Sequence, residues 1–525
     1  MIILGIGGIL GDAATAILKD GVLVAAVEES KLVRRRTQWV SHGELPAHSI
    51  ATCLELAGVR PSQVDTVAIV RPVPETDFHL KLRAQFPSSR IVVLEHHRAH
   101  AASAYYPSPF EEAMVLTLDR GGDFRCGSRW HASGTNMTLE AEQYLPDSLG
   151  DLYGRVTELL GFDSRVDEHK VQWLSVSGDD RYRDLFLDII GGSDSGVRFD
   201  RSFFSTERLQ HGGFGSRFYE RIGLKDNEPI PEEMQAHVAS GVQKAVETTV
   251  IRLAGREKNL CLAGGLGLNS LLVSALEQAA GPQHVFVQPA AGNAGTALGA
   301  VLETWHGMYG KKQRVAIDSL CLGPEYTAGE IKQVLENCKL RFRYMLMEDE
   351  VVSSAVAQLS ESKIVAWMHG RMEFGARALG NRSILASPLD SYSTENLNIF
   401  IKHRERFRKF AASVPAEVAA QYFEVGPNAR YLATVGRVKP EYREKFAAAI
   451  LADDLVRVHT VDRSENPLYW KLLHAAGKTS GLPVLYNTSF NLFGEPLVCT
   501  PRDAVRSFYS SGIDAMFVGH FFLQK

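Results

Sequence analysis

Apolar and polar positions alternate in blocks along the chain, and these blocks predict an α/β protein. Apolar runs at residues 2–6, 113–118 and 259–263 have the length of buried strands, and each ends in a turn rich in Gly or Asp. Between them, apolar residues spaced by three and four predict helices over residues 44–57 and 232–254. Strands that alternate with helices in this way are typical of α/β folds.

The turns that close these three strands consist largely of small residues. The first contains Gly11 and Asp12, the second is Asp119-Arg-Gly-Gly-Asp, and the third is Gly264-Gly265. Small residues let a backbone approach a phosphate closely. Three such turns in this order indicate the two-lobed nucleotide-binding pattern of actin and the sugar kinases, although any one of them could be an ordinary turn. We assign Asp12 and Asp119 to the catalytic set, and Gly264, Gly265 and Asn269 to nucleotide binding.

A second α/β region follows a polar stretch that is rich in Gly and Lys at residues 306–314. It contains a predicted strand at residues 364–368, a segment rich in Gly and Arg, and strands near Val484 and Met516. We therefore predict a first domain over residues 1–340, with two lobes, and a second domain over residues 345–525.

Composition narrows the function classes. The 525 residues carry a formal net charge of −4, which predicts no broad basic surface and no nucleic-acid partner. The six cysteines are scattered without a Cys-x-x-Cys pair, so neither a zinc knuckle nor a disulfide framework is indicated. No apolar run reaches the length of a membrane span, which is about 20 residues. We expect a cytoplasmic enzyme with reduced thiols and no membrane partner.

The segment His96-His-Arg-Ala-His follows a predicted strand and opens a predicted helix. Residues four apart share one face of a helix, so His96 and His100 could bind one metal ion, with a third ligand from elsewhere. The alternative is a pair of polar caps at a helix start. His97 points to another face, and we give it no metal role.

A second polar candidate lies in a run of small residues at 288–299. Asn293 is the one side chain of this run that could bind a metal strongly through oxygen. Close packing of the run against a neighbouring helix is the alternative interpretation.

Three segments of the second domain carry groups suited to anions. Residues 370–383 hold three Arg beside glycines, and Arg binds phosphate through two parallel hydrogen bonds. Cations recur at every second position of residues 402–408 and would share one face of an extended segment; an exposed strand edge is the alternative. Residues 487–491 supply small hydroxyls and amides after a strand, where an ordinary polar turn is equally compatible. We assign to substrate and nucleotide binding Arg371, Glu373, Arg377, Arg382, Lys402, Arg404, Ser489 and Asn491.

Together these motifs resemble the NodU/CmcH family of O-carbamoyltransferases. Residues 96–110 (HHRAHAASAYYPSPF) are similar to its HHxxHAASAFxxSPF segment, and residues 262–269 (LAGGLGLN) to its LAGGxALN segment. Residues 371–385 (RMEFGARALGNRSIL) and 487–491 (NTSFN), the latter followed by Gly-Glu-Pro, match nearly letter for letter. The resemblance extends over essentially the whole chain.

The resemblance implies a TsaD-like first domain and a YrdC-like second domain. In the family, carbamoyl phosphate and ATP form a carbamoyl adenylate in the second domain. The carbamoyl group then passes to an acceptor hydroxyl in the first domain, where iron or a similar divalent metal, with magnesium as an alternative, is bound. By the same resemblance His96 and His100 are metal ligands, and Asn293 occupies the position of a third. The expected partners are carbamoyl phosphate, ATP and a small specialised metabolite of the kind found in antibiotic biosynthesis, with a homodimer as a candidate assembly.

Two departures from the family pattern concern the metal region. Asn293 stands where the family has Asp, and Gly11 stands where it has His. An amide oxygen attracts a cation less than a carboxylate does, so we expect a weakened metal site.

Two alternatives to an active carbamoyltransferase remain. One is a divergent paralogue that acts as a partner subunit or performs altered acyl-adenylate chemistry. The other, from the fold pattern alone, is a phosphotransferase of the sugar-kinase type. A carbamate ester as product, a phosphate ester, or no turnover without a partner would distinguish the three.

Overall fold

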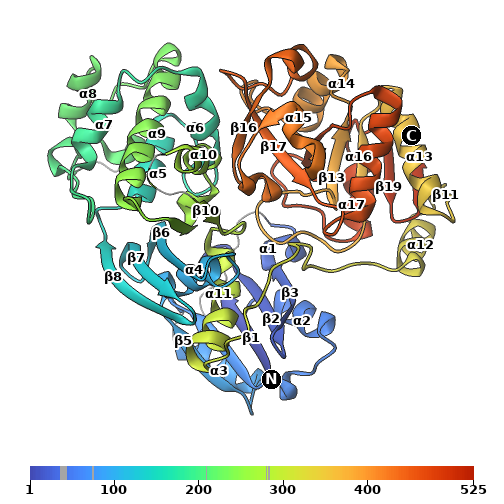
Figure 1. Ribbon diagram of the computed structural model, residues 1–525, viewed down its shortest axis with the longest axis horizontal. Coiled ribbons are helices and arrows are strands. Elements are labelled where there is room, and N and C mark those ends of the chain that lie inside the picture. Colours follow the sequence, from blue (N-terminus) through green and yellow to red (C-terminus); the bar gives the residue numbers. More distant parts are fainter. Residues whose placement is uncertain (36–43, 74–75, 208–209, 280, 282–283) are drawn as a thin grey trace. The chain divides into compact units, whose positions relative to one another are not determined.

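The computed structural model describes residues 1–35, 44–73, 76–207, 210–279, 281 and 284–525 (Figure 1). The chain packs as two compact units. Unit 1 contains residues 1–93 together with 315–525, and unit 2 contains residues 94–314. Compact units of packing need not coincide with the domains of a protein family. The predicted division into residues 1–340 and 345–525 therefore stays a prediction.

The first part of unit 1 is a five-stranded mixed sheet in the order β3-β2-β1-β4-β5. The dipeptide Asp20-Gly21, which is typical of a two-residue hairpin turn, joins β2 to β3, and both residues have the positive φ that such a turn requires (52° and 83°). Helix α2 begins after Pro46 and buries Ile50, Cys53 and Leu54 in the same apolar cluster as the strands. The bounds here are β1 (Ile2–Gly7), β2 (Ala14–Lys19), β3 (Val22–Glu28), α1 (Glu29–Val33), α2 (Ala47–Leu56), β4 (Thr66–Val70), α3 (Thr76–Gln85) and β5 (Arg90–Leu94).

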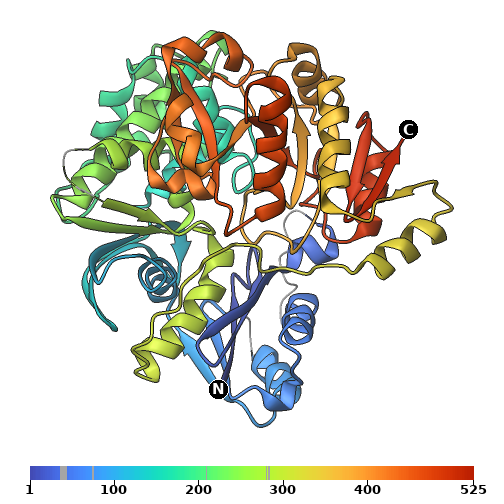
Figure 2. The same ribbon diagram turned by 45° about the vertical axis from the view of Figure 1, so that its right-hand side comes forward.

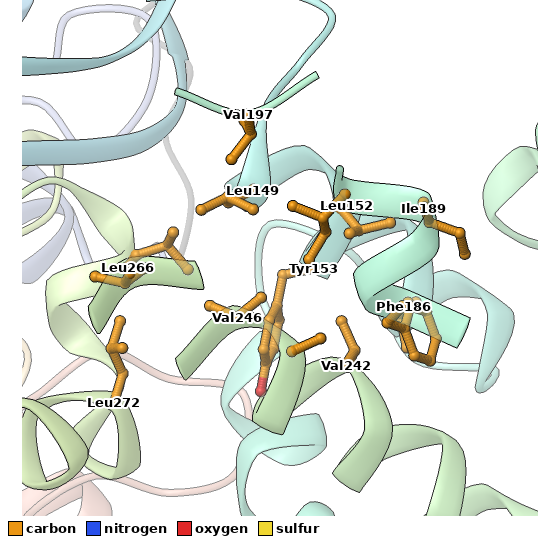
Figure 3. Close-up of a cluster of buried hydrophobic side chains, with 14 of the residues drawn as sticks. Leu149, Leu152, Tyr153, Phe186, Ile189, Val197, Val242, Val246, Leu266 and Leu272 are labelled. Atoms are coloured by element: carbon orange, nitrogen blue, oxygen red, sulfur yellow. The ribbon is translucent and has the colours of Figure 1, made fainter. Parts of the chain in front are cut away.

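Unit 2 is built on a five-stranded sheet in the order β10-β9-β6-β7-β8. Its larger core lies between Leu116 and Leu118 of β6 and the helices α5, α7, α9 and α10, whose side chains meet in Figure 3. The predicted helix over residues 232–254 is confirmed as α9. The bounds are α4 (His96–Tyr105), β6 (Glu112–Gly122), β7 (Arg125–Ser133), β8 (Asn136–Tyr144), α5 (Leu149–Leu159), α6 (Glu168–Leu174), α7 (Arg183–Ile190), α8 (Ser216–Ile222), α9 (Glu232–Ala254), β9 (Asn259–Ala263), α10 (Ser270–Gln278), β10 (His284–Val287) and α11 (Thr296–Glu303).

One predicted turn lies inside a strand. The segment Asp119-Arg-Gly-Gly continues β6, because Gly122 still pairs with Arg125 of β7 beyond an irregularity in the register. The tight turn falls instead on Asp123 and Phe124, both at positive φ. The strand therefore carries Asp119 within the sheet instead of on a free loop.

The second part of unit 1 is a ten-stranded sheet in the order β11-β20-β19-β12-β13-β18-β14-β17-β16-β15. The strands predicted at residues 364–368 and near Val484 and Met516 are confirmed as β12, β18 and β19. Figure 2 shows the C-terminus at the end of β20, which pairs with the edge strand β11. The bounds are α12 (Ala328–Asn337), β11 (Arg343–Tyr344), α13 (Glu348–Ser360), β12 (Val365–Met368), β13 (Arg382–Ala386), α14 (Ser391–Asn396), β14 (Ala411–Pro415), α15 (Ala419–Tyr422), β15 (Phe423–Glu424), β16 (Val435–Val438), β17 (Leu455–Val461), α16 (Pro467–Ser480), β18 (Leu485–Ser489), α17 (Pro501–Tyr509), β19 (Ala515–Val518) and β20 (Phe521–Gln524).

The basic segment 402–408 is not an extended strand. It follows a π-helical turn (Leu397–Ile401), His403 has a positive φ of 45°, and a turn begins at Arg406. Its cations would share one face only if the segment were extended, and it is not. Lys402 is buried, Arg404 is half-buried and Arg406 is exposed.

The run of small residues at 288–299 lets α11 cross α4 at very short range. A Cβ added to Gly299 would lie 1.8 Å from the carbonyl oxygen of Ala99. The close helix packing that we considered for this run therefore occurs. Arg98 of α4 pairs with Glu303 of α11 at 2.6 Å beside the same crossing.

Two further observations bear on the expectations from composition. The six cysteines form no disulfide bond in the described parts of the chain. No helix among the described residues is both long enough and apolar enough to span a membrane.

The crossing of α4 and α11 predicts an effect of Gly299→Ala on stability. The added methyl group must displace backbone, so we expect the free energy of unfolding to fall by about 2–3 kcal/mol. Gly329→Ala is the control, because Gly329 lies in α12 with its nearest neighbouring atom 3.9 Å away and has no positive φ. That variant should be neutral or slightly stabilising. Urea unfolding followed by circular dichroism measures both, and equal stability of the two variants would contradict the tight crossing.

Candidate functional sites in the two units

Helix α4 places the histidine motif at its first turn. The Glu95 carboxylate caps the helix by accepting hydrogen bonds from the backbone N–H groups of His97 (2.9 Å) and Arg98 (2.7 Å). The helix therefore begins at His96, and His96 and His100 lie on one face as the spacing predicts. Their Nε2 atoms are 3.1 Å apart.

Strand β6 supplies a carboxylate to the same point. Because side chains alternate along a strand, Leu116 and Leu118 enter the large core while Thr117 and Asp119 face α4. The Oδ2 atom of Asp119 lies 3.0 Å from His96 Nε2 and 3.2 Å from His100 Nε2. All three side chains are buried, and their ligand atoms lie within 4.8 Å of one another.

Two glycines make room for this cluster, which we call the His–Asp triad (His96, His100 and Asp119). A Cβ on Gly122 would lie 2.3 Å from the ring of His96, so that position requires Gly. Gly265 brings its backbone N–H to 3.3 Å from Asp119 Oδ1, which also accepts from the N–H of Arg120. Gly265 therefore contacts the triad directly.

The triad forms a coupled electrostatic group. Burial alone would raise the pKa of Asp119, but hydrogen bonds from His100 and His96 outweigh it and hold that pKa well below its usual range. Burial lowers the pKa of His100, although its hydrogen bond to Asp119 opposes the shift. The carboxylate is therefore ionised and the imidazole of His100 tends towards its neutral form, the protonation states that metal ligands require.

His97 is directed elsewhere, as its place in the helix predicts. Its Nδ1 lies 2.7 Å from the hydroxyl of Thr117 on the facing strand, and burial lowers its pKa to about 3. This histidine packs α4 against β6 as a neutral ring.

Asn293 begins the short turn η6 (Asn293–Gly295), which packs against α4. Its Oδ1 atom is buried and has no hydrogen-bond partner. An unpartnered buried carbonyl oxygen is costly in a folded protein. This is the feature expected of an amide that binds a cation, and its place as a metal ligand stays a prediction.

The donor set fits a divalent metal ion. Two imidazole nitrogens and one carboxylate oxygen converge in a buried site, the ligand pattern of iron and zinc centres. Asp119, which the sequence places in the catalytic set, thus becomes a third candidate ligand. The signal for it in the sequence was only the alternation of β6, because a single Asp after an apolar run is common.

The other nucleotide-binding candidates of unit 2 have structural partners. Gly264 has φ +91° and approaches the backbone of Leu118 so closely that a Cβ would lie 2.2 Å from that carbonyl oxygen. Asn269 caps α10 through the N–H groups of Leu271 and Leu272, and its Nδ2 donates to Gln243. In unit 1, Asp12 lies exposed in the turn after β1 with a positive φ of 62°.

In the second part of unit 1, two of the predicted arginines donate hydrogen bonds to backbone carbonyl oxygens. Arg371 donates to the carbonyl oxygens of Val24, Leu322 and Gly323, and Arg382 is fully buried among four such oxygens. Glu373 accepts through Oε1 from the backbone N–H groups of Leu379, Asn381 and Arg382. These three side chains shape the loop that carries Arg377.

Lys402, Ser489 and Asn491, which we assigned to substrate and nucleotide binding, lie in contact with one another. Lys402 Nζ donates to the carbonyl oxygens of Ser489 and Asn491 and to Asn491 Oδ1, the last at 2.7 Å. Ser489 donates to the same Oδ1 atom at 2.8 Å. The buried ammonium group thus fixes the conformation of the loop after β18, and whether it also contacts a ligand stays a prediction.

Four guanidinium groups of this part of unit 1 are electrostatically coupled. Burial, and then the cations of Arg377, Arg404 and Arg408, lower the pKa of Arg457 well below its ordinary value. Glu405 forms an ion pair with Arg408 at 3.6 Å. Arg457 was not found from the sequence, because it stands alone on β17 outside any motif. We call this group the arginine cluster (Arg377, Arg404, Arg408 and Arg457).

Comparison with known proteins identifies the family. The sequence model described as "Carbamoyltransferase N-terminus" matches residues 78–302, and the one described as "Carbamoyltransferase C-terminus" matches residues 356–525. The chain belongs to the carbamoyltransferase family. The resemblance seen in the motifs is thereby confirmed.

Relatives of this chain match along most of their length. An uncharacterised Synechocystis protein, sll1178, is 32% identical over 100% of this chain and 96% of its own. Nodulation protein NolNO of Sinorhizobium fredii is 33% identical over 98% and 79%, and Nodulation protein U of Rhizobium tropici is 25% identical over 92% and 90%.

Solved structures match more weakly. HypF of T. kodakarensis is 13% identical over 59% of this chain and 48% of its own, with a TM-score of 0.34. The ROK hexokinase of Thermus thermophilus is 17% identical over 58% and 99%, with a TM-score of 0.29. The predicted α/β class of the chain is confirmed by its own sheets and helices.

The triad predicts which histidine variant loses metal. His100→Ala removes a ligand and should abolish the binding of ferrous iron or zinc that the parent protein shows, whereas His97→Ala should keep the parent's affinity because that ring contacts Thr117 instead. Metal content after dialysis, measured by plasma mass spectrometry, separates the two. Equal loss in both variants would contradict the assignment, as would a parent protein that binds no metal.

The position of Asn293 predicts that a carboxylate in its place would raise the affinity for metal. Asn293→Asp adds a negative charge to the ligand set, so the dissociation constant for a divalent metal should fall by about tenfold or more. Titration with a competing chelator measures it, with Asn269→Asp as the control, since Asn269 caps α10 and lies outside the triad. Tight stoichiometric binding by the parent protein would refute the idea of a weakened site.

Proposed function

We propose that the protein is an ATP-dependent O-carbamoyltransferase that transfers the carbamoyl group of carbamoyl phosphate to a hydroxyl of a small specialised metabolite. The observation that carries the proposal is the arginine cluster, in a chain of the carbamoyltransferase family. Guanidinium groups remain protonated even when their pKa falls. Guanidinium groups bind phosphate oxygens through paired, charge-assisted hydrogen bonds, so a group of them suits the phosphates of the proposed substrates.

The cluster supports formation of an acyl adenylate. Hydrolysis of carbamoyl phosphate releases inorganic phosphate and carbamate. An oxygen of carbamate then attacks the α-phosphorus of ATP, the bond to the β-phosphate oxygen breaks, and pyrophosphate leaves. Arg377, Arg404 and Arg457 would neutralise the charge that develops on these phosphates. Lys402 would add a positive charge while it holds the loop in place.

In the second step the acceptor hydroxyl attacks the carbamoyl carbon, and AMP leaves with the bonding electrons. AMP is a far better leaving group than hydroxide, which explains the use of ATP. The residues that would hold a divalent metal are His96, His100 and Asp119, with Asn293 as a fourth, and the metal would supply Lewis-acid polarisation of an oxygen. We assign this chemistry to the cytoplasm, in line with the unpaired cysteines.

A divergent paralogue without transfer activity is the second candidate. It is favoured by one observation, the neutral amide of Asn293 where the family pattern has a carboxylate. Such a protein would still form the adenylate but would release no carbamate ester without a partner. Product analysis by mass spectrometry distinguishes the two, and a phosphate ester as product would instead indicate a phosphotransferase.

The arginine cluster predicts the effect of Arg404→Ala. Loss of one charge-assisted contact should cost about 1.5–3 kcal/mol, or roughly 10- to 150-fold in exchange of pyrophosphate into ATP that depends on carbamoyl phosphate. Arg406→Ala is the matched control, because Arg406 is exposed two residues further along the same segment. Unchanged exchange in Arg404→Ala, or an equal loss in both variants, would remove Arg404 from the site.

A further inference from the structure

Helix α1 contacts the loop that carries Arg377, within unit 1. Lys31 Nζ donates to the carbonyl oxygens of Glu373 (2.8 Å) and Gly375 (2.9 Å) and pairs with Glu28 Oε1 at 2.8 Å. The same Glu28 oxygen accepts from the backbone N–H of Gly375 at 2.7 Å. Lys31 and Glu28 are both buried, so these contacts are shielded from solvent.

Arg34, which ends α1, holds a second loop. Its guanidinium donates to the carbonyl oxygens of Pro496 and Leu497 and pairs with Glu495 Oε2 at 3.1 Å. The backbone of Arg34 has a φ of 61°, which is unfavourable for any residue with a Cβ and persists only where the surroundings fix it. The side chain is 17% exposed and makes these contacts from that conformation.

The second loop leads directly to Lys402. The carbonyl oxygen of Glu495 accepts from Asn491 Nδ2 at 2.8 Å, and Asn491 Oδ1 accepts from Lys402 Nζ at 2.7 Å. One continuous set of hydrogen bonds therefore joins Arg34 to the buried ammonium group two residues before Arg404. Helix α1 contacts both loops that border the arginine cluster.

We infer that Lys31 and Arg34 are positioning residues for the anion site, although neither belongs to the segments that form it. The inference rests on the proposed function for the identity of the anion. Without Arg34, the loop at residues 495–497 loses the hydrogen bonds to two of its carbonyl oxygens and an ion pair at Glu495. The partners of Lys402 are then no longer held in one geometry. Because small displacements of charged groups weaken binding strongly, carbamoyl phosphate should bind less tightly, while turnover at saturation should largely survive.

The test compares Arg34→Ala and Arg34→Lys with Arg506→Ala. Arg506 is the matched control, since it reaches the same Glu495 at 3.6 Å from α17 but is 72% exposed. Calorimetry with carbamoyl phosphate alone should show the dissociation constant raised by about tenfold in Arg34→Ala, less in Arg34→Lys, and by under about twofold in Arg506→Ala. In the exchange assay KM for carbamoyl phosphate should rise while kcat changes little. Amide hydrogen exchange of residues 489–498 should be faster in Arg34→Ala alone.

Each other outcome is decisive. Parental affinity in Arg34→Ala, an equal effect in Arg506→Ala, or a loss in kcat with unchanged KM would overturn the inference. If Arg34→Ala does not fold, Glu495→Gln removes the ion pairs of Glu495 with Arg34 and with the exposed Arg506 but keeps the bonds of Arg34 to the carbonyl oxygens, and its affinity for carbamoyl phosphate, compared with that of Arg506→Ala, decides instead. A parent protein that binds carbamoyl phosphate but exchanges no pyrophosphate would refute the proposed function. The dissociation constants of the Arg34 variants would then still test the role of Arg34. A parent protein that binds no carbamoyl phosphate would refute both.

Discussion

The carboxylate of Asp119 lies buried between the imidazoles of His96 and His100, and much of unit 2 is arranged so that this contact can form. The alternation of β6 turns Asp119 towards α4, and the Glu95 cap sets the first turn of that helix at His96. Gly122 leaves space for the ring of His96, while the backbone N–H of Gly265 donates to the other oxygen of the carboxylate. A buried carboxylate needs such partners because an isolated charge away from water is very costly.

Arginine performs two different tasks in the C-terminal part of unit 1. Arg371 and Arg382 donate to backbone carbonyl oxygens and hold the loop at residues 370–382 in shape. Arg377 belongs to the same loop but, together with Arg404 and Arg408, interacts electrostatically with Arg457. The neighbours of each guanidinium group in the fold decide which task it performs. The sequence of the loop does not distinguish its three arginines.

Much of the protein could be predicted from the sequence. The hairpin at Asp20-Gly21, the helix that begins at His96 and the helix at residues 232–254 follow from local rules of turn geometry, capping and periodicity. The pairing of His96 with His100 is equally local, since four residues separate them on one helix. Lys402, Ser489 and Asn491 were assigned together to ligand binding, which stays a prediction, and only the structure shows that they contact one another. The cations that alternate at residues 402–408 would share one face only in an extended segment, and the segment is not extended, because His403 takes a positive φ and a turn begins at Arg406.

What the sequence by itself determined are the features set by neighbours along the chain: the α/β class, the strand and helix positions, and the residue types that suit metal and phosphate. Tertiary structure alone decided which distant groups meet. Asp119 joins the triad from 19 residues beyond His100. Arg457 enters the arginine cluster from a lone position on β17, and Arg34 reaches a loop more than 460 residues away. Such contacts depend on strand order and loop closure, which no periodicity in the sequence encodes.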